Sequence, residues 1–263
     1  MKFIGDYHTH TIYSRKPYIP YHHAKGSIED NIISAKENGL QELGIADHGF
    51  THRFFGCSRK NLKKTKEEIL RLSQKHNIKV YFGVEANFIS QDGTIDIIDS
   101  DKNYLDIILC GFHRVAKPKT LKDKFKIFIP NMLAKFFGTS KKLIERNTNT
   151  VINAIKKNDI DIVTHLNSKM KCNVVEIAKV AAEKGTLIEI NEKHCDFSKE
   201  EIAGMLETKV NFIVSSDAHK PAKIGKFTKV EKLILENNIP ESRIVNLNKS
   251  PNFLNQRKIK NEK

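Results

Sequence analysis

Two histidines, His8 and His10, follow a short apolar run near the start of the chain, in the segment KFIGDYHTH. Side chains alternate between the faces of an extended strand, so both imidazoles would point to one side, about 7 Å apart along the backbone. That is a chelating geometry, although a single His-x-His pair more often serves surface polarity or core hydrogen bonding. A metal site therefore needs further ligands from elsewhere in the chain.

Further candidate ligands stand at the ends of other apolar runs. Seven runs, with helical patterns between most of them, have the composition of buried strands, and they span residues 2–8, 42–48, 79–87, 105–113, 159–165, 186–191 and 211–219. Six of the seven end in residues that can bind a metal, which are His8 and His10, Asp47 and His48, Glu85, His113, His165, and Asp217 and His219.

These side chains would lie in one pocket, because a barrel of parallel strands gathers the carboxyl ends of its strands at one rim. Buried together without ions, so many polar groups would be costly to desolvate. Divalent ions remove that cost, since they accept lone pairs from neutral imidazoles and balance the carboxylates. The pattern therefore favours a metal site over scattered core histidines.

Strands that alternate with helices predict a parallel sheet in an α/β fold. Capping boxes that begin at Ser27 and Ser198 predict two helix starts, and the pattern over 173–184 predicts a helix that ends at Gly185. Seven such units without an obvious linker predict a single domain over 1–263, closed into a TIM-like (β/α) barrel.

The composition is that of a globular protein, with 39% hydrophobic and 29% charged residues. The four cysteines have no CxxC spacing and are expected to be reduced thiols. We find neither a signal peptide nor an apolar run of roughly 18 to 20 residues, so we expect a cytoplasmic protein without a transmembrane segment. The net charge of +14 favours an anionic substrate or partner.

A basic, phenylalanine-rich segment at about 114–146 does not fit a bare barrel and is interpreted as a helical insertion. It holds ten Lys and Arg residues against Asp123 and Glu145. The favoured interpretation is packing, with lysines solvated opposite an apolar face made of Phe125, Phe128, Ile129, Met132, Leu133 and Phe136. A lid, a nucleic-acid surface and a helix resting on a membrane are the alternatives. The polar tail from about 255 is expected to fray.

Several motifs, taken in order, resemble those of the PHP (polymerase and histidinol phosphatase) family. They are DYHTHT, HAKGSIED, IADHG, GVEAN, GFH, VTH and SSDAH, and the resemblance covers about residues 5 to 250. It is closest to the stand-alone bacterial phosphoesterases with a trinuclear metal site in a distorted (β/α)7 barrel. One departure follows His165, where this chain has Leu-Asn and the family commonly has Pro-Gly.

The resemblance implies three divalent ions at the C-terminal rim of the strands, with Zn expected and Mn or Fe as alternatives. It implies one ion held by His8, His10, Glu85 and Asp217, a second held by Glu85, His113 and His165, and a third held by His23, His48 and His219. His22 is the alternative to His23 in the loop after the first strand.

The resemblance and the expected charge of the site favour hydrolysis of a small phosphomonoester by a metal-bound hydroxide, with histidinol phosphate as one family example. The candidate catalytic carboxylates are Asp47, Glu85 and Asp217, of which Asp47 could handle a proton or instead cap a turn. The candidate phosphate-binding residues are Arg15, Arg53 and Arg114, each of which could instead be a solvated surface charge.

Three other functions compete with this one. A nuclease or nucleotide phosphodiesterase would use the same ions together with the basic segment. An amidohydrolase also begins with His-x-His, but commonly uses two metals and has no role for His23, His48 and His219 together. A catalytically silent barrel would tend to lose ligands. The sequence leaves the natural substrate and the oligomeric state open.

Overall fold

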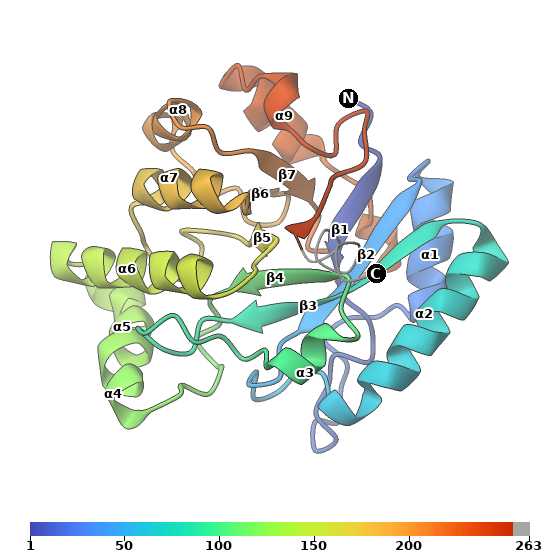
Figure 1. Ribbon diagram of the computed structural model, residues 1–263, viewed down its shortest axis with the longest axis horizontal. Coiled ribbons are helices and arrows are strands. Elements are labelled where there is room, and N and C mark those ends of the chain that lie inside the picture. Colours follow the sequence, from blue (N-terminus) through green and yellow to red (C-terminus); the bar gives the residue numbers. More distant parts are fainter. Residues whose placement is uncertain (255–263) are drawn as a thin grey trace.

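Seven parallel strands form one sheet in the order β1 to β7 in the computed structural model, which describes residues 1–254 (Figure 1). The strands are β1 Gly5–Thr9, β2 Glu42–His48, β3 Lys79–Asn87, β4 Ile107–Gly111, β5 Ile162–Val163, β6 Leu187–Asn191 and β7 Phe212–Ser215. The sheet nearly closes into a barrel, since Thr9 pairs with Ala218 in a single parallel bridge beyond β7. The predicted (β/α)7 barrel is confirmed.

Helices lie between the strands and cover the outside of the sheet (Figure 1). They are α1 Ile28–Glu37, α2 Leu62–His76, α3 Asp99–Lys102, α4 Leu121–Asp123, α5 Ile129–Phe137, α6 Lys141–Lys157, α7 Val174–Lys184, α8 Lys199–Leu206 and α9 Thr228–Glu236. No helix in the described part of the chain is long and apolar enough to cross a membrane. The tail expected to fray from about 255 lies outside the described residues.

The helix ends follow the predicted capping signals. The Ser27 side chain accepts a hydrogen bond from the Asp30 backbone N–H, and the Asp30 carboxylate accepts one from Ser27. Ser198 starts α8 with the same capping box. Gly185 ends α7 in the left-handed conformation, with φ of +74°.

The two ends of the barrel interior differ in chemistry. Near the amino ends of the strands, the rings of Tyr7, Tyr81 and Phe253 pack edge to face with centroids 5.3 to 5.6 Å apart. All three side chains are buried, and Tyr7 also donates a hydrogen bond to the Glu42 carboxylate. This end of the interior is therefore mostly aromatic, and the candidate ligands lie at the opposite end.

The segment 114–146 forms α4, a π-helical stretch at Lys124–Phe128, α5 and the start of α6. The expected packing of its apolar face is wrong for most of the six residues. Phe128 is buried, whereas Phe125, Met132, Leu133 and Phe136 are exposed. A π-helical stretch changes the phase of the residues that follow it, which a 3.6-residue periodicity does not predict. The face that contacts the barrel is therefore a different one.

Candidate metal centre

A single carboxylate, that of Glu85 on β3, lies at the centre of the polar end of the barrel. Five imidazoles come within 3.7 Å of its oxygens, and they belong to His8, His10, His48, His113 and His165. The nearest contacts are 2.5 Å to His165 Nε2 and 2.7 Å to His48 Nδ1. Residues from five different strands or the loops after them thus meet at one point, as the strand ends predicted.

Three groups of side chains bring their ligand atoms within 4.8 Å of one another. They are His8, His10 and Asp217; His48, Glu85 and His113; and His10, His48 and His219. The groups share members, because His10 and His48 each belong to two of them. Imidazole and carboxylate are suitable ligands for Zn, Mn and Fe alike.

The surroundings of several buried imidazoles fit ligation of divalent ions. His48 Nε2 and His219 Nε2 are buried without a hydrogen-bond partner among residues 1–254. Burial lowers the pKa of His219 to about 3 and holds that of His10 well below its ordinary value. The His10 and His219 imidazoles are therefore neutral at pH 7, and a neutral ring nitrogen has the lone pair that a metal requires.

Glu189 on β6 orients two of the candidate ligands. Its Oε1 accepts a hydrogen bond of 2.8 Å from His8 Nδ1, and its Oε2 accepts one of 2.9 Å from the backbone N–H of His165. The first bond leaves His8 Nε2 facing Glu85 and Asp217. Glu189 had no predicted role, although a carboxylate inside the apolar run LIEIN was a signal for one, and the structure buries it fully.

Asn87 and Asp96 orient His113 in a similar way. Asn87 Oδ1 lies 2.9 Å from His113 Nδ1, and Asn87 Nδ2 donates a bond of 2.7 Å to Asp96. Asp96 also accepts bonds from the backbone and hydroxyl of Thr51, in the loop after β2. This network ties the loop after β2 to the end of β3, and partners of this kind fix the tautomer and direction of a ligand.

The loops after β5 and β7 hold candidate ligands in left-handed backbone conformations. The φ angles are +32° at His165 and +53° at Asp217, which are uncommon for residues other than glycine. Asn167, in the Leu-Asn departure from the family pattern, has φ of +67°, and its side chain bonds to Cys172 and Glu201. Asparagine tolerates this conformation, so the turn after His165 forms without glycine.

His23 lies beside the groups but not within them. Its ring is exposed, stacks on Phe55 at 4.5 Å and lies 4.2 Å from the ring of His219, between centroids. His22 is also exposed, and its Nδ1 lies 3.0 Å from the backbone carbonyl of Ile12. The geometry thus favours His23 over His22 as the loop ligand.

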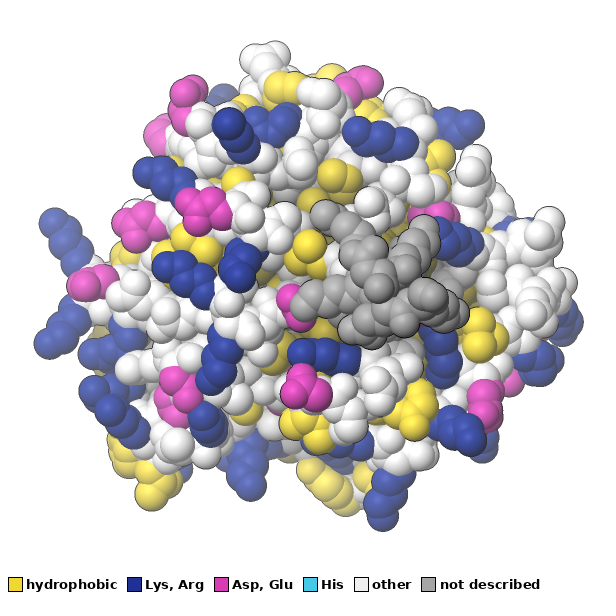
Figure 2. Space-filling view, in the orientation of Figure 1, with side chains coloured by type: hydrophobic (Ala, Val, Ile, Leu, Met, Phe, Trp, Pro, Cys, Tyr) yellow, Lys and Arg dark blue, Asp and Glu magenta, His cyan; other side chains and the backbone are white. Residues whose placement is uncertain are grey.

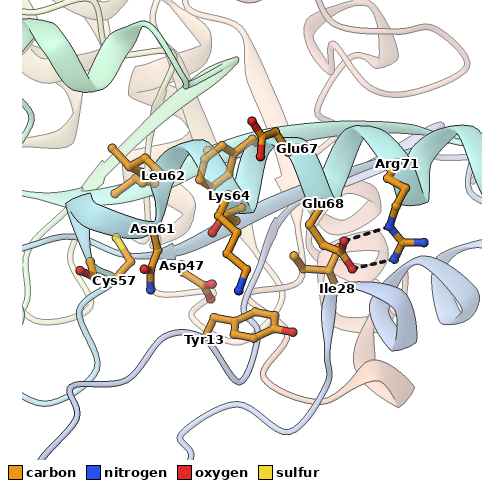
Figure 3. A pocket seen from close by; sticks show the side chains of 15 residues that line it. Tyr13, Ile28, Asp47, Cys57, Asn61, Leu62, Lys64, Glu67, Glu68 and Arg71 are labelled. Atoms are coloured by element: carbon orange, nitrogen blue, oxygen red, sulfur yellow. Dashed lines mark hydrogen bonds and ion pairs between the residues drawn. The ribbon is translucent and has the colours of Figure 1, made fainter.

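Asp47 lies beside the three groups but belongs to none of them. Its carboxylate accepts bonds of 2.7 and 2.6 Å from the backbone N–H and hydroxyl of Thr11, and Oδ1 lies 3.9 Å from His10 Nδ1. These bonds hold the loop after β1 against β2, as a turn cap would. Asp47 also lines a cavity of about 480 Å³ under α2, with Tyr13, Asn61 and Lys64 (Figure 3). None of the nine candidate metal ligands lines that cavity.

The candidate arginines lie at the edge of the site or away from it. Arg15 donates to the Ile19 carbonyl, and Arg53 is exposed. Within residues 1–254 neither has a hydrogen bond or ion pair to a candidate ligand. Arg114 donates a bond of 3.2 Å to the Asn131 carbonyl, and burial lowers its pKa.

Two lysines that sequence analysis missed lie at the rim of the site. Lys193 Nζ is 3.3 Å from Asp217 Oδ2 and 3.2 Å from His219 Nδ1. Lys169 is half-buried, and this burial lowers its pKa although Glu85 and Asp217 act in the opposite direction. A cavity of about 400 Å³ borders Asp217 and His219, and its lining includes Lys193, Lys220, Lys223, Lys226 and Lys229. The rim is therefore cationic.

Comparison with known proteins agrees with this architecture. The sequence pattern of the PHP domain matches residues 6–193. A probable phosphatase of Thermoanaerobacter sp. strain X514 is 30% identical, with 99% of this chain and 98% of the relative covered. A probable phosphatase of Clostridium botulinum strain Hall is 29% identical, with 94% of this chain and 91% of the relative covered.

The fold is also similar to that of solved structures. Among them is the histidinol phosphate phosphatase of Lactococcus lactis in complex with Zn, L-histidinol and phosphate. Its TM-score is 0.59 at 15% identity, with 90% of this chain and 94% of that chain covered. The chain belongs to the PHP domain family. Together with the full-length relatives, this membership makes it a phosphatase-type hydrolase, which confirms the predicted reaction class.

Proposed function

We propose that the chain is a metal-dependent phosphatase that hydrolyses a small phosphomonoester with the help of up to three divalent ions. The observation that carries this proposal is the convergence of three overlapping ligand groups on Glu85 at the buried end of the barrel. Zn is the first candidate, since the fold neighbour from L. lactis was solved with Zn and phosphate. Mn and Fe remain chemically suitable.

The candidate ligands divide among three positions. His8, His10 and Asp217 would hold one ion, and His113 and His165 would hold a second with Glu85 between the two. His48 and His219 would hold the third, with His23 completing it from its loop. When bound, such ions supply Lewis acidity toward the phosphoryl oxygens and a water of lowered pKa.

The residues around these positions have supporting roles. Glu189 and Asn87 would keep His8 and His113 in the tautomers that present Nε2 to the site. Lys193 and Lys169 would bind the oxygens of the phosphate group, because an ammonium group donates charge-assisted hydrogen bonds to an anion. Asp47 would act as a positioning residue, since its bonds to Thr11 fix the loop after His10.

The cationic rim supports a phosphorylated substrate. Five lysines line the cavity that borders Asp217 and His219, and at about 400 Å³ this cavity has the size of a small-molecule site. A neutral amide would gain little from such a charge. The rim therefore favours an anionic ester over the substrate of an amidohydrolase.

Elemental analysis combined with a phosphate-release screen tests the proposal. We expect bound Zn, Mn or Fe and release of phosphate from at least one phosphorylated metabolite. In His10→Ala and Asp217→Ala we expect lower metal content and activity reduced at least 100-fold. His76→Ala, on α2 and paired with Glu29, is the control and should retain both.

Two results would contradict the proposal. Full activity in either ligand variant would show that the substituted residue is not an essential metal ligand. Cleavage of labelled single-stranded oligonucleotides without release of phosphate from any monoester would show that the protein is a nuclease and not a phosphatase.

The role of the rim lysines has its own test. Lys169→Gln removes one charge-assisted hydrogen bond to the substrate, worth about 1.5 to 3 kcal/mol. We expect kcat/KM to fall roughly 10-fold to 100-fold, mainly through KM, while metal content is unchanged. Lys199→Gln on the exposed surface of α8 is the matched control. An unchanged kcat/KM in Lys169→Gln would assign this lysine to the fold alone.

A further inference from the structure

The helical segment from Leu121 to Phe137, which comprises α4, the π-helical stretch and α5, is fixed to the barrel by one face. Ile127 and Phe128 are buried there, and the Phe128 ring lies 5.2 Å from that of Phe112, between centroids. Asn131 exchanges two hydrogen bonds of 2.8 Å with Asn147 on α6. The segment is therefore a packed element of the molecule, with a defined outward face.

That outward face is apolar. Six large hydrophobic side chains are exposed along it, namely Leu121 (74%), Phe125 (63%), Met132 (50%), Leu133 (45%), Phe136 (73%) and Phe137 (84%). Figure 2 shows hydrophobic side chains projecting at the lower left edge of the molecule, over α4 and α5, with Lys and Arg side chains around them. An exposed cluster of this kind on a globular protein marks an interaction site.

Lysines surround the apolar side chains. Lys122, Lys124, Lys126, Lys135, Lys141 and Lys142 are exposed, and none forms an ion pair with a carboxylate of the described chain. The carboxylate of Asp123 does not offset them, because it is buried and accepts bonds from Ser90, Gln91 and Thr120. Glu145 on α6 lines the same hollow as Lys142 and can offset only part of the charge, so this surface has a net positive charge.

We propose that this α4–α5 surface, made of the six exposed hydrophobic residues and the six lysines, binds an anionic lipid bilayer. The segment would lie along the membrane plane, with phenylalanine, leucine and methionine side chains at the boundary of headgroups and acyl chains and the lysines against lipid phosphates. A helix with bulky apolar residues on one side and lysines around them has the composition of interfacial membrane helices. This property is separate from the proposed hydrolysis.

Other occupants fit the surface less well. A second copy of the chain would bring six lysines against six lysines, in a protein of net charge +14. Single-stranded nucleic acid would stack on the phenylalanines, but Leu121, Met132 and Leu133 have no ring to stack on. A bilayer matches the aliphatic side chains, the aromatic side chains and the positive charge together.

Vesicle co-sedimentation tests the apolar part of the surface. We expect the full chain to bind vesicles of phosphatidylcholine with 30% phosphatidylglycerol at 0.1 M salt and to bind pure phosphatidylcholine at least tenfold more weakly. In Phe136→Ser/Phe137→Ser, binding to the anionic vesicles should fall at least tenfold. Leu70→Ser/Leu235→Ser changes two exposed leucines on α2 and α9 and should bind as the unmodified chain does.

A charge-matched pair of variants tests the lysines. Lys122→Glu/Lys126→Glu should weaken binding to the anionic vesicles at least tenfold. Lys199→Glu/Lys209→Glu changes the net charge equally on a surface near α8 and should have a smaller effect. Equal losses in the two pairs would mean that net charge alone drives the binding, which would overturn the assignment to this surface.

Three further outcomes would overturn the proposal. The first is the absence of binding to anionic vesicles, and the second is equal binding by the phenylalanine variant and its leucine control. The third is evidence that something other than a bilayer binds the surface. Light scattering that shows a dimer which Phe136→Ser/Phe137→Ser dissociates would assign the surface to self-association. Oligonucleotide binding lost in that variant, without vesicle binding, would assign it to nucleic acid.

Discussion

Glu85 is the residue around which the candidate site is arranged, since five imidazoles surround its two oxygens. A carboxylate can bridge two ions, whereas an imidazole binds one ion through a given nitrogen. Around this centre, the side chains that orient the ligands form a second layer, in which Glu189 contacts two ligands. It bonds both to the His8 ring and to the His165 backbone.

Glu189→Gln tests that second layer. The amide keeps the size of the side chain but weakens its bond to His8 Nδ1, so we expect metal affinity to fall by roughly 10-fold to 100-fold. Metal titration of the purified variant would measure this change. Glu183→Gln, at an exposed position of α7, is the control and should titrate as the unmodified protein does. Unchanged affinity in Glu189→Gln would show that His8 does not depend on this bond.

At the scale of elements, the strands and the loops after them have different roles in forming the site. The strands are buried and apolar, and they bring residues far apart in sequence to one rim. The loops after β5 and β7 then turn sharply, with His165 and Asp217 at positive φ. Backbone strain of this kind persists only where surrounding contacts hold it, and it clusters at functional sites.

The helices hold the strands in place, and their caps contribute to stability. Ser27→Ala removes the hydrogen bond that caps α1, and we expect the free energy of unfolding to fall by about 1 kcal/mol in urea denaturation. Ser58 precedes a short 3-10 turn without forming a side-chain cap bond, so Ser58→Ala is the matched control. A similar effect of the two substitutions would mean that the cap of α1 contributes nothing measurable.

At the scale of the whole molecule, bound ions should stabilise the fold, because the ligands come from strands across the barrel. An ion present at 100 times its Kd adds about 2.7 kcal/mol per site to the free energy of unfolding. We expect a chelator to lower Tm by roughly 5 to 10 °C for each ion removed, at about 2 to 4 °C per kcal/mol for a chain of this size. Thermal melts before and after chelation measure this shift, and Asp217→Asn should show a smaller one.

Stability should also depend on pH through the buried histidines. Burial lowers the pKa of His52 to about 3, below its ordinary value of 6.5, so between these values the unfolded chain binds more protons than the folded one. This contribution is complete above pH 6.5 and is lost as the pH falls toward 3. For the metal-free protein, we expect the free energy of unfolding to decrease from pH 7 to pH 4.

A variant isolates this contribution. His52→Asn keeps an acceptor for the Phe55 backbone N–H but cannot titrate. We expect its stability to change less steeply with pH, by up to about 1.4 kcal/mol per pH unit. Urea denaturation at several pH values measures both slopes, and equal slopes would show that His52 does not contribute.

The sequence by itself determined the barrel, the strand ends that supply His8, Glu85, His165 and Asp217, and the caps of α1 and α8. These features follow from local patterns, since burial on both faces gives continuous apolar runs and a cap needs only neighbouring residues. The family resemblance added the class of reaction, which the relatives confirm.

Only the tertiary structure decided which charges face the site and which apolar side chains face solvent. Lys169, Lys193 and Glu189 reach the site from the loops after β5 and β6 and from β6 itself, and no local pattern distinguishes them from other polar residues. The π-helical stretch before α5 likewise determined which face of that segment packs on the barrel. The physical reason is the same in both cases, because contacts between residues distant in sequence depend on how the elements are oriented in space.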